Sequence, residues 1–371
     1  MRNYNFENIE IKAMAATVPD DCEQLMDFSS LLPEGEMEKF CQTTGIYQRY
    51  AGHHKKVIAS DLCVVAAEYI FQKFPELKSK IDALVFMSQS FDYSSPATAG
   101  VIQMRLGLDQ CGVAYDITYG CAAFPFGLQI AGSFISGGCQ NVLLLIGDNG
   151  TAPEIKDKDD LLFGDAGCAI VVGRMDCGSE RIPGGIQIRL ETIGSKYQAL
   201  MFPFGANRHR YYDIVAEVGE ENASKLLGRY MNGPDVFTFS IKDTPRAVKR
   251  FYEDFHCDAD DFDFAAIHQA NRMIVDNVAK RIQFKKEKVP IAMDRYANTN
   301  GVSVPITICD FFERTSAAGI KRVLSVAFGI GMSIGVCSCY IDSAVCLPII
   351  KTDKSYDDGI DYQEFLLKRC R

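Results

Sequence analysis

The chain has 371 residues, of which 47% are hydrophobic and 23% charged, and its formal net charge at pH 7 is −9. These proportions are typical of a globular protein, and the length allows two domains or one large one. The negative charge argues against general nucleic-acid binding, which needs a basic surface. Because no run of about eighteen apolar residues and no apolar signal segment occurs, we expect a cytoplasmic protein without a membrane span.

The first half alternates between two kinds of hydrophobic pattern. Residues 60–74 and 97–106 have the pattern of helices, whereas short apolar runs at 83–87, 141–147 and 168–173 have that of buried strands. Apolar strands that alternate with helices indicate an α/β protein with buried sheets.

The same order of elements returns after a polar, glycine-rich stretch at 175–185, which is interpreted as a linker. Residues 264–267 are strand-like, 270–282 are helical and 322–328 are strand-like again. The second half is therefore expected to resemble the first in element order, although no direct sequence repeat is found.

These observations predict a division of the chain into an N-terminal half, 1–178, a C-terminal half, 179–345, and an extension, 346–371. Residues 200–235 are polar and irregular in pattern, so we expect them to form a mobile cap. The charged stretch 351–358 in the extension is expected to be solvated.

A cysteine stands where a predicted strand turns into a predicted helix. The strand-like run 114–119 ends at Gly120 and Cys121, and a helical pattern of small and apolar residues follows. The positive end of a helix dipole favours a thiolate, which is the nucleophilic form of cysteine. Cys121 is therefore predicted to be a nucleophile, and His268 and Asn298, which follow it in the chain, would complete an acyl-transfer site.

The fourteen cysteines include no Cys-x-x-Cys pair, so most are expected to be small buried side chains. The five histidines are scattered, and none pairs with cysteines at metal-ligand spacing. The sequence therefore predicts no metal site.

Besides the Cys121 segment, five blocks carry a likeness to a known family: Thr44-Gly-Ile46 with Arg49, Leu162-Phe-Gly-Asp-Ala-Gly167, His268-Gln-Ala-Asn271, Ala297-Asn-Thr-Asn-Gly-Val-Ser-Val-Pro305 and Ala327-Phe-Gly-Ile-Gly331. These blocks occur in the same order as in the family. The chain from about Ile11 to Ile341 thus resembles the β-ketoacyl-acyl-carrier-protein synthase III family of condensing enzymes, in the thiolase superfamily. The resemblance implies an α/β, thiolase-like five-layer α-β-α-β-α fold made of two similar halves, and a homodimer.

The resemblance also implies an acyltransferase. Cys121 would take the acyl group of a thioester, and a malonyl thioester on acyl carrier protein would lose CO₂ and attack it, giving a 3-oxoacyl thioester. His268 and Asn298 would stabilise the enolate as neutral donors. The backbone N–H groups of Cys121 and Ile330 would form the oxyanion hole. Asn271 follows His268 by three residues, so on a helix it would share its face and orient a water molecule.

Three positions depart from the family pattern at the coenzyme A entrance: Lys39, Thr43 and Met273 stand where the resemblance places a Trp and two Arg. This departure favours a donor held on acyl carrier protein. No cofactor is implied beyond the coenzyme A or phosphopantetheine that carries the substrates.

Two further features concern the acyl group and the carrier. Ser95 stands where a Phe shapes the acyl pocket in the commonest family members, so room for a longer or bulkier acyl group is expected. Lys280 and Arg281 are candidates for carrier docking, and a solvated helix end explains this basic pair equally well.

Several alternatives stay open or are disfavoured. The same acyl-cysteine chemistry can transfer the acyl group to an oxygen or nitrogen nucleophile in a specialised pathway, without decarboxylation. A papain-type hydrolase fits the spacing of Cys121 and His268 loosely but lacks its signature. A non-catalytic subunit is disfavoured by the intact Cys, His and Asn, and a hydroxymethylglutaryl-type synthase by the lack of a Glu in 84–90.

Overall fold

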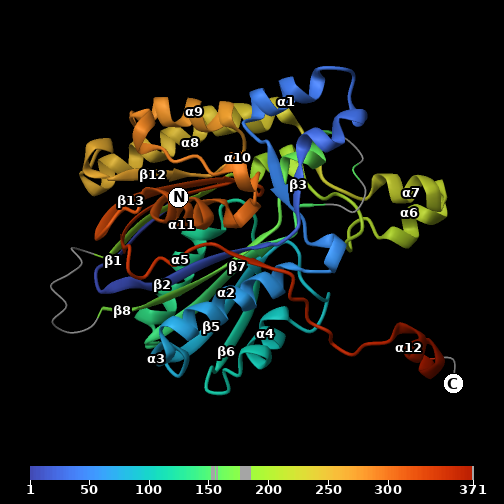
Figure 1. The fold of residues 1–371 in the computed structure, drawn as a ribbon, viewed down its shortest axis with the longest axis horizontal. Helices are drawn as coiled ribbons and strands as arrows, with labels where there is room; N and C mark the ends of the chain where they lie inside the picture. The colour runs from blue at the N-terminus through green and yellow to red at the C-terminus, as the bar shows by residue number, and fades with distance from the viewer. Residues whose placement is uncertain (152–154, 156–157, 176–184, 370–371) are drawn as a thin grey trace.

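The computed structural model describes residues 1–151, 155, 158–175 and 185–369. Two sheets form its framework (Figure 1). The first has the strand order β15-β2-β8-β7-β5-β6. Its members are β2 (Ile9–Pro19), β5 (Ile81–Ser88), β6 (Val113–Thr118), β7 (Asn141–Asp148), β8 (Ala166–Arg174) and β15 (Ile350–Thr352).

The second sheet has the order β1-β9-β14-β13-β12. It consists of β1 (Arg2–Phe6), β9 (Ile186–Thr192), β12 (Phe264–Ile267), β13 (Ile320–Gly329) and β14 (Ser333–Asp342). The predicted strands 83–87, 141–147, 168–173, 264–267 and 322–328 each lie inside a strand of one of the two sheets, and the run 114–119 extends one residue beyond β6, so these predictions are confirmed.

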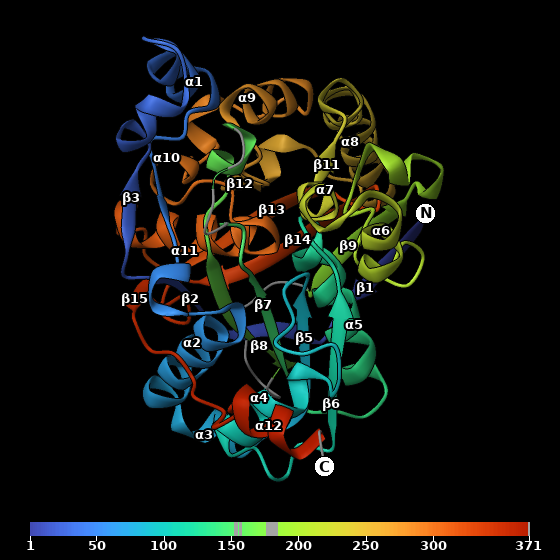
Figure 2. The ribbon, with the colours of Figure 1, turned by 90° about the vertical axis from the view of Figure 1, so that its right-hand side faces the viewer.

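Helices separate and cover the sheets. The helices α2 (Ala59–Lys73) and α4 (Thr98–Leu106) cover the outer face of the first sheet, and α5 (Ala123–Ser136) and α11 (Ser303–Thr315) lie between the sheets. The helix α8 (Gly233–Phe255), with α9 (Arg272–Arg281) beside it, covers the outer face of the second sheet. In Figure 2, α8 and α9 lie at the top and α2 and α4 at the bottom, with the two sheets between them, and the predicted five-layer fold is confirmed.

The alternation of side chains along β5 shows why its sequence is apolar throughout. Ala83, Val85 and Met87 pack into the central core around α5 and α11, whereas Leu84 and Phe86 pack under α2 and α4. Successive side chains of a strand point to opposite faces. Because helices cover both faces, neither set of positions can be polar.

The two halves exchange their terminal strands. The N-terminal β1 pairs with β9 in the second sheet, and the C-terminal β15 pairs with β2 in the first. The predicted division at 178 and 179 therefore does not separate the two sheets, and part of the extension is built into the N-terminal half. Most of the predicted linker, at 176–184, lies outside the described residues.

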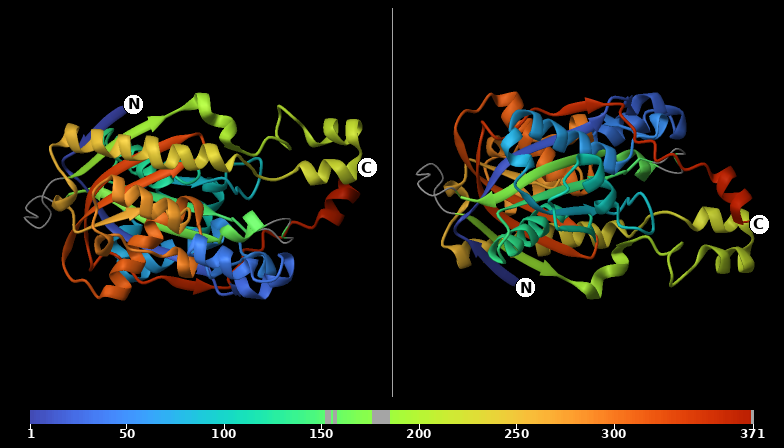
Figure 3. Two further views of the ribbon diagram at one scale, coloured as in Figure 1. Left: turned by 90° about the horizontal axis from the view of Figure 1, so that it is seen from above. Right: turned by 90° about the horizontal axis from the view of Figure 1, so that it is seen from below.

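The region expected to be an irregular cap contains regular elements. The short strands β10 (Leu200–Met201) and β11 (Tyr230–Met231) pair with each other and enclose α6 (Tyr211–Val218) and α7 (Glu220–Leu226). As Figure 3 shows, α6 and α7 extend from the body of the molecule. Elements this short have too little periodicity to be recognised in the sequence.

The helices α1 (Glu36–Thr44), α3 (Pro75–Lys78) and α12 (Tyr362–Arg369) lie at the periphery, whereas α10 (Met293–Tyr296) has no exposed residue and packs against the core through Met293. The predicted solvated stretch 351–358 is exposed except at Thr352, in β15. Across the described residues, no helix has the length and apolar character that a membrane crossing requires.

Candidate active site

A cavity of about 230 Å³ brings the three predicted catalytic side chains together. Cys121, His268 and Asn298 all line it, although they come from three segments far apart in the sequence. Cys121 follows β6, His268 follows β12, and Asn298 lies in the loop after α10.

Close packing fixes the position of Cys121 between β6 and α5. The residue is only 7% exposed. A Cβ atom on Gly329 would lie 2.6 Å from the Cβ and 2.8 Å from the Sγ of Cys121. A Cβ atom on Gly120 would lie 2.3 Å from Oε1 of Gln89. A side chain at either glycine would therefore require the neighbouring side chains to move.

The expectation that the helix terminus favours a thiolate is wrong for the resting structure. Burial raises the pKa of the Cys121 thiol to about 11, although backbone N–H groups of Ile330 and Cys121 lower it. A helix terminus stabilises a charge by only about 0.3–1 kcal/mol in ordinary settings, which is less than one pKa unit. The resting residue is thus a neutral thiol.

The loop after β13 directs a backbone donor at the Cys121 sulfur. The unusual backbone angles fall on Gly329, with φ of +157°, and on Gly331, with φ of +127°, and not on Ile330. The hydroxyl of Ser333 donates to the carbonyl of Ile330 at 3.0 Å, which fixes the neighbouring peptide. The isoleucine side chain is therefore compatible with a loop that presents its N–H.

His268 is buried and neutral. It is 2% exposed, and burial lowers its pKa to about 3. Its Nδ1 lies 2.5 Å from the Ser303 hydroxyl, and its ring meets Phe328 edge to face. If Ser303 donates to Nδ1, the ring proton sits on Nε2, and this tautomer makes His268 a hydrogen-bond donor.

Asn298 is also oriented as a donor. Its backbone pairs with the segment Leu162–Gly164 through Asn298 N–H to Leu162 O and Gly164 N–H to Asn298 O. Its side-chain Oδ1 accepts from the Asn300 N–H at 3.0 Å. With the oxygen occupied in this way, the amide NH₂ is the polar group that Asn298 can direct at a substrate.

Asp148 is a cavity residue that the sequence analysis missed. It ends β7 and is 1% exposed, and it accepts from the backbone N–H groups of Gln89, at 2.7 Å, and Gly301, at 3.3 Å. Burial raises its pKa to about 7. Asp148 thus ties together two loops of the cavity. Its position at the end of the apolar run 141–147 was the feature of the sequence that could have identified it as a site residue.

Asn271 does not lie on a helix with His268, so the proposed shared helix face is wrong. It is the N-cap of α9 in extended conformation, and its Oδ1 accepts from the Ile274 N–H at 2.9 Å. It still lines the cavity. Asn before the helical pattern was a recognisable N-cap signal.

Ser95 lies in an exposed loop and does not line the cavity of the single chain. Within one subunit, Ser95 therefore does not widen the cavity for a longer or bulkier acyl group in the way that the sequence analysis expected.

Lys280 and Arg281 are exposed in the last turn of α9. Because α9 begins at the cavity, a rise of 1.5 Å per residue places this basic pair about 12–14 Å from the cavity end of the helix. The three predicted entrance positions, Lys39, Thr43 and Met273, are exposed on α1 and α9, which contact each other.

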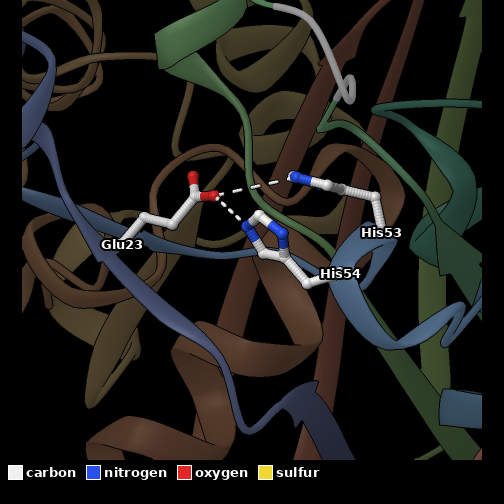
Figure 4. A group of neighbouring side chains, drawn as sticks. All are labelled: Glu23, His53 and His54. Carbon is white, nitrogen blue, oxygen red and sulfur yellow. Dashed lines mark hydrogen bonds and ion pairs between the residues drawn. The ribbon is translucent and has the colours of Figure 1, made fainter.

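A separate cluster offers three possible metal ligands (Figure 4). The Oε1 atom of Glu23 lies 2.9 Å from Nε2 of His54 and 3.8 Å from Nε2 of His53. The Oε2 atom of Glu23 accepts from the buried Arg49 at 2.7 Å. Burial alone would raise the pKa of Glu23, but Arg49 and His54 together lower it.

Because Arg49 already balances the carboxylate charge, we interpret the cluster as structural: the Arg49–Glu23 ion pair joins β4 (Gln48–Tyr50) to β3 (Cys22–Gln24), and a hydrogen bond joins Glu23 to His54 in the loop after β4. The absence of a metal site stays a prediction.

Two family models match the chain. The model described as 3-oxoacyl-[acyl-carrier-protein (ACP)] synthase III matches residues 115–187, which include Cys121. The model for the C-terminal part of the same synthase matches residues 253–341, which include His268, Asn298 and Ile330.

Individual proteins match over nearly the whole chain. A β-ketoacyl-[acyl-carrier-protein] synthase III of Natranaerobius thermophilus is 29% identical and covers 89% of this chain and 98% of its own. One of Caldanaerobacter subterraneus is 29% identical over 84% of this chain and 90% of its own. The solved structure of a 3-oxoacyl-(acyl-carrier protein) synthase of Burkholderia xenovorans LB400 superimposes with a TM-score of 0.85 at 25% identity, over 95% of this chain and 99% of its own. Parts of both halves match this family, and the chain is therefore similar to the 3-oxoacyl-[acyl-carrier-protein] synthase III family along most of its length.

Proposed function

We propose that this protein is an acyltransferase that carries out a decarboxylating Claisen condensation through an acyl-Cys121 intermediate. An acyl thioester and malonyl-acyl-carrier-protein would give a 3-oxoacyl thioester, CO₂ and a free thiol. The observation that carries the proposal is the meeting of Cys121 with two neutral donors, His268 and Asn298, in one cavity. The names of the relatives support the same reaction.

In the first half-reaction the Cys121 sulfur attacks the thioester carbonyl. The S–C bond to the donor thiol breaks, an acyl-cysteine forms, and the proton of Cys121 leaves with the donor thiol. The N–H groups of Cys121 and Ile330 hold the oxyanion of the tetrahedral intermediate. The same two groups lower the pKa of the buried sulfur and so assist the attack.

In the second half-reaction the malonyl thioester loses CO₂ and leaves an enolate. The Nε2–H group of His268 and the amide of Asn298 donate to the enolate oxygen. Neutral donors suit this oxygen because a carboxylate in their place would repel the developing charge. The enolate carbon then attacks the acyl-cysteine carbonyl, the S–C bond to Cys121 breaks, and the released thiolate takes up a proton from the solvent. No cofactor takes part beyond the carrier arms.

The proposal is tested by measuring acylation and CO₂ release separately. Incubation with a panel of acyl thioesters, followed by mass spectrometry of the intact protein, detects the acyl-enzyme. CO₂ release from malonyl-carrier in the presence of an acyl donor detects the condensation. The alternative, acyl transfer to an oxygen or nitrogen nucleophile, predicts acylation of Cys121 without CO₂ release.

Acyl carrier protein is the proposed partner, and Lys280 with Arg281 is its proposed docking site. Both side chains are exposed at the far end of a helix that begins at the cavity. A basic pair in a chain of net charge −9 favours contact with an acidic carrier. The three exposed entrance residues, Lys39, Thr43 and Met273, offer neither a stacking Trp nor a phosphate-binding Arg, so we expect weak binding of free coenzyme A esters.

A homodimer completes the proposal. The strand β6, which leads to Cys121, is at the edge of its sheet and is partly exposed, as Tyr115 at 54% illustrates. An open edge is able to pair with a second copy. Such pairing would bring the exposed Ser95 loop of one subunit towards the cavity of the other. Sedimentation at micromolar concentration should give a dimer, and a monomer would contradict this.

A further inference from the structure

One carboxyl group in the cavity wall is buried without a counter-charge. Asp148 is 1% exposed, and no ion pair joins it to a basic side chain of the described residues. Burial first, and then the charge of the second buried acid Asp165, raise the pKa of Asp148 to about 7. Since a buried charge that lacks a partner is costly, a carboxyl group at this place requires a reason beyond packing.

Hydrogen bonds reach Asp148 from two directions. Its Oδ1 accepts from the Gln89 N–H at 2.7 Å and from the Ser88 hydroxyl at 3.4 Å. Its Oδ2 accepts from the Gly301 N–H at 3.3 Å. An ionised carboxylate accepts at both oxygens, whereas a protonated carboxyl group carries a hydrogen on one of them. The ionised group therefore holds Gln89 and Gly301 together more strongly than the neutral group does.

The segment of Gly301 lies directly against the turn that carries Cys121. A Cβ atom on Gly301 would lie only 3.1 Å from the carbonyl oxygen of Gly120, the residue before the cysteine. Gly301 is also the third residue after Asn298. Its hydrogen bond to Asp148 therefore helps to fix the Asn298 amide relative to the Cys121 sulfur.

The charge of Asp148 acts on the free thiol in the opposite sense. Besides burial, the ionised carboxylate is a cause of the raised pKa of Cys121, so it disfavours the thiolate. The other titratable groups around this carboxyl group are Asp165, which precedes β8, and Cys63 of α2. Burial raises the pKa of Cys63 well above its ordinary value, so that thiol stays neutral. The carboxylate thus improves the placement of one catalytic group and lowers the reactivity of another.

We propose that Asp148 is a positioning residue of the second half-reaction: its ionised carboxylate holds the Asn298 turn in place for decarboxylation, at a cost to the reactivity of the free Cys121 thiol. The inference rests on the proposed function, since it concerns the same condensation. The hold is complete above the Asp148 pKa of about 7 and weakens as the pH falls through that value, because the carboxyl group then takes up a proton.

The test compares three rates in the wild type and in Asp148→Asn, which removes the charge and leaves an acceptor at one oxygen only. Alkylation of the free thiol by iodoacetamide at pH 8 should rise about 2- to 10-fold, since one cause of the raised Cys121 pKa is then missing. Acylation by a thioester should be no slower than in the wild type. CO₂ release from malonyl-carrier by protein acylated beforehand should fall about 10- to 100-fold, as expected for a displacement of up to about 1 Å.

The pH dependence of CO₂ release is a readout that a purely structural role would not change. In protein acylated beforehand the Cys121 sulfur no longer titrates, and His268, whose pKa burial lowers to about 3, stays neutral. CO₂ release by the wild type should therefore fall about tenfold from pH 8 to about pH 6, following the ionised fraction of Asp148. The Asp148→Asn protein should show no such fall.

Asp82→Asn is the matched control. Asp82 also accepts from two backbone N–H groups, those of Gln140 and Asn141, but it lies at the other end of β5 from Gln89. All three rates in this control should equal those of the wild type.

Equal loss of acylation and CO₂ release in Asp148→Asn, or unchanged CO₂ release in that variant, would overturn the inference and leave the proposed condensation intact. CO₂ release by the wild type that stayed constant from pH 8 to about pH 6 would also overturn it, even if the variant failed to fold. If acylated wild-type protein released no CO₂ at any pH, the proposed function itself would fall, and the inference with it.

Discussion

Replacing Gly329 by Ala should stop acylation of Cys121 while leaving the protein folded. The added Cβ would lie 2.6 Å from Cβ and 2.8 Å from Sγ of Cys121, whereas ordinary contact begins at 3.4 Å. The cysteine and the glycine loop must therefore separate by about 1 Å. The loop carries the N–H of Ile330, so this movement pulls one oxyanion donor away from the site of attack.

The expected loss of acylation rate follows from the cost of moving the oxyanion donor and of moving the Cys121 sulfur. Loss of one oxyanion donor lowers kcat by about 10²- to 10³-fold, and misplacement of a reacting atom by 1 Å can cost about 10²-fold by itself. We expect acylation of Cys121 to slow by at least about 10²-fold. Because φ at Gly329 is +157°, alanine there should also lower the free energy of unfolding by about 1–3 kcal/mol.

The assay is the rate of mass gain on Cys121 with a saturating acyl thioester, together with thermal unfolding. Gly319→Ala is the matched control. Gly319 has φ of +76°, but a Cβ there would meet nothing within 4 Å. The control should lose stability from backbone strain and acylate normally. Gly329→Ala protein that acylated at the wild-type rate would refute the assignment of the Gly329–Gly331 loop to the oxyanion hole.

Three further outcomes are expected. His268→Ala and Asn298→Ala should slow CO₂ release about 10²- to 10³-fold and acylation much less, and equal loss in both half-reactions would contradict the division of labour. Alkylation of Cys121 by iodoacetamide should rise about tenfold per pH unit from pH 7 towards its pKa of about 11, because only the thiolate reacts; a plateau near pH 7 would contradict the buried neutral thiol. Charge reversal in Lys280→Glu with Arg281→Glu should lower efficiency with carrier-bound donors and remove its salt dependence, while coenzyme A esters are unaffected; unchanged kinetics with carrier would exclude this docking site.

Local patterns were sufficient to predict the strands and to single out Cys121, whereas His268 and Asn298 were predicted from the family blocks around them. The run 141–147 is apolar at every position because both faces of β7 are buried, and such a run is visible without a structure. Cys121, His268 and Asn298 each lie in a short block whose residues are fixed by close contacts. Gly120, for example, has no room for a side chain next to Gln89.

Features that depend on distant parts of the chain were not predictable in this way. The residues of β1 and β15 do not indicate by themselves that these strands pair with β9 and β2. The raised pKa of Cys121 comes from burial, which only the assembled layers produce. Arg229 stands in a region that the sequence analysis described only as polar and irregular, but in the structure it precedes β11 and lines the cavity.

The central claim is that one acyl group on Cys121 is consumed for each CO₂ released. The most direct measurement loads the wild-type protein with an acyl group, removes free donor, and adds malonyl-carrier with a labelled carboxyl carbon. We predict that the mass gain on Cys121 disappears as an equal amount of labelled CO₂ is released, and that Cys121→Ala protein never gains the mass. Acyl groups that stay on Cys121 while CO₂ is released, or mass gain in the Cys121→Ala protein, would contradict it.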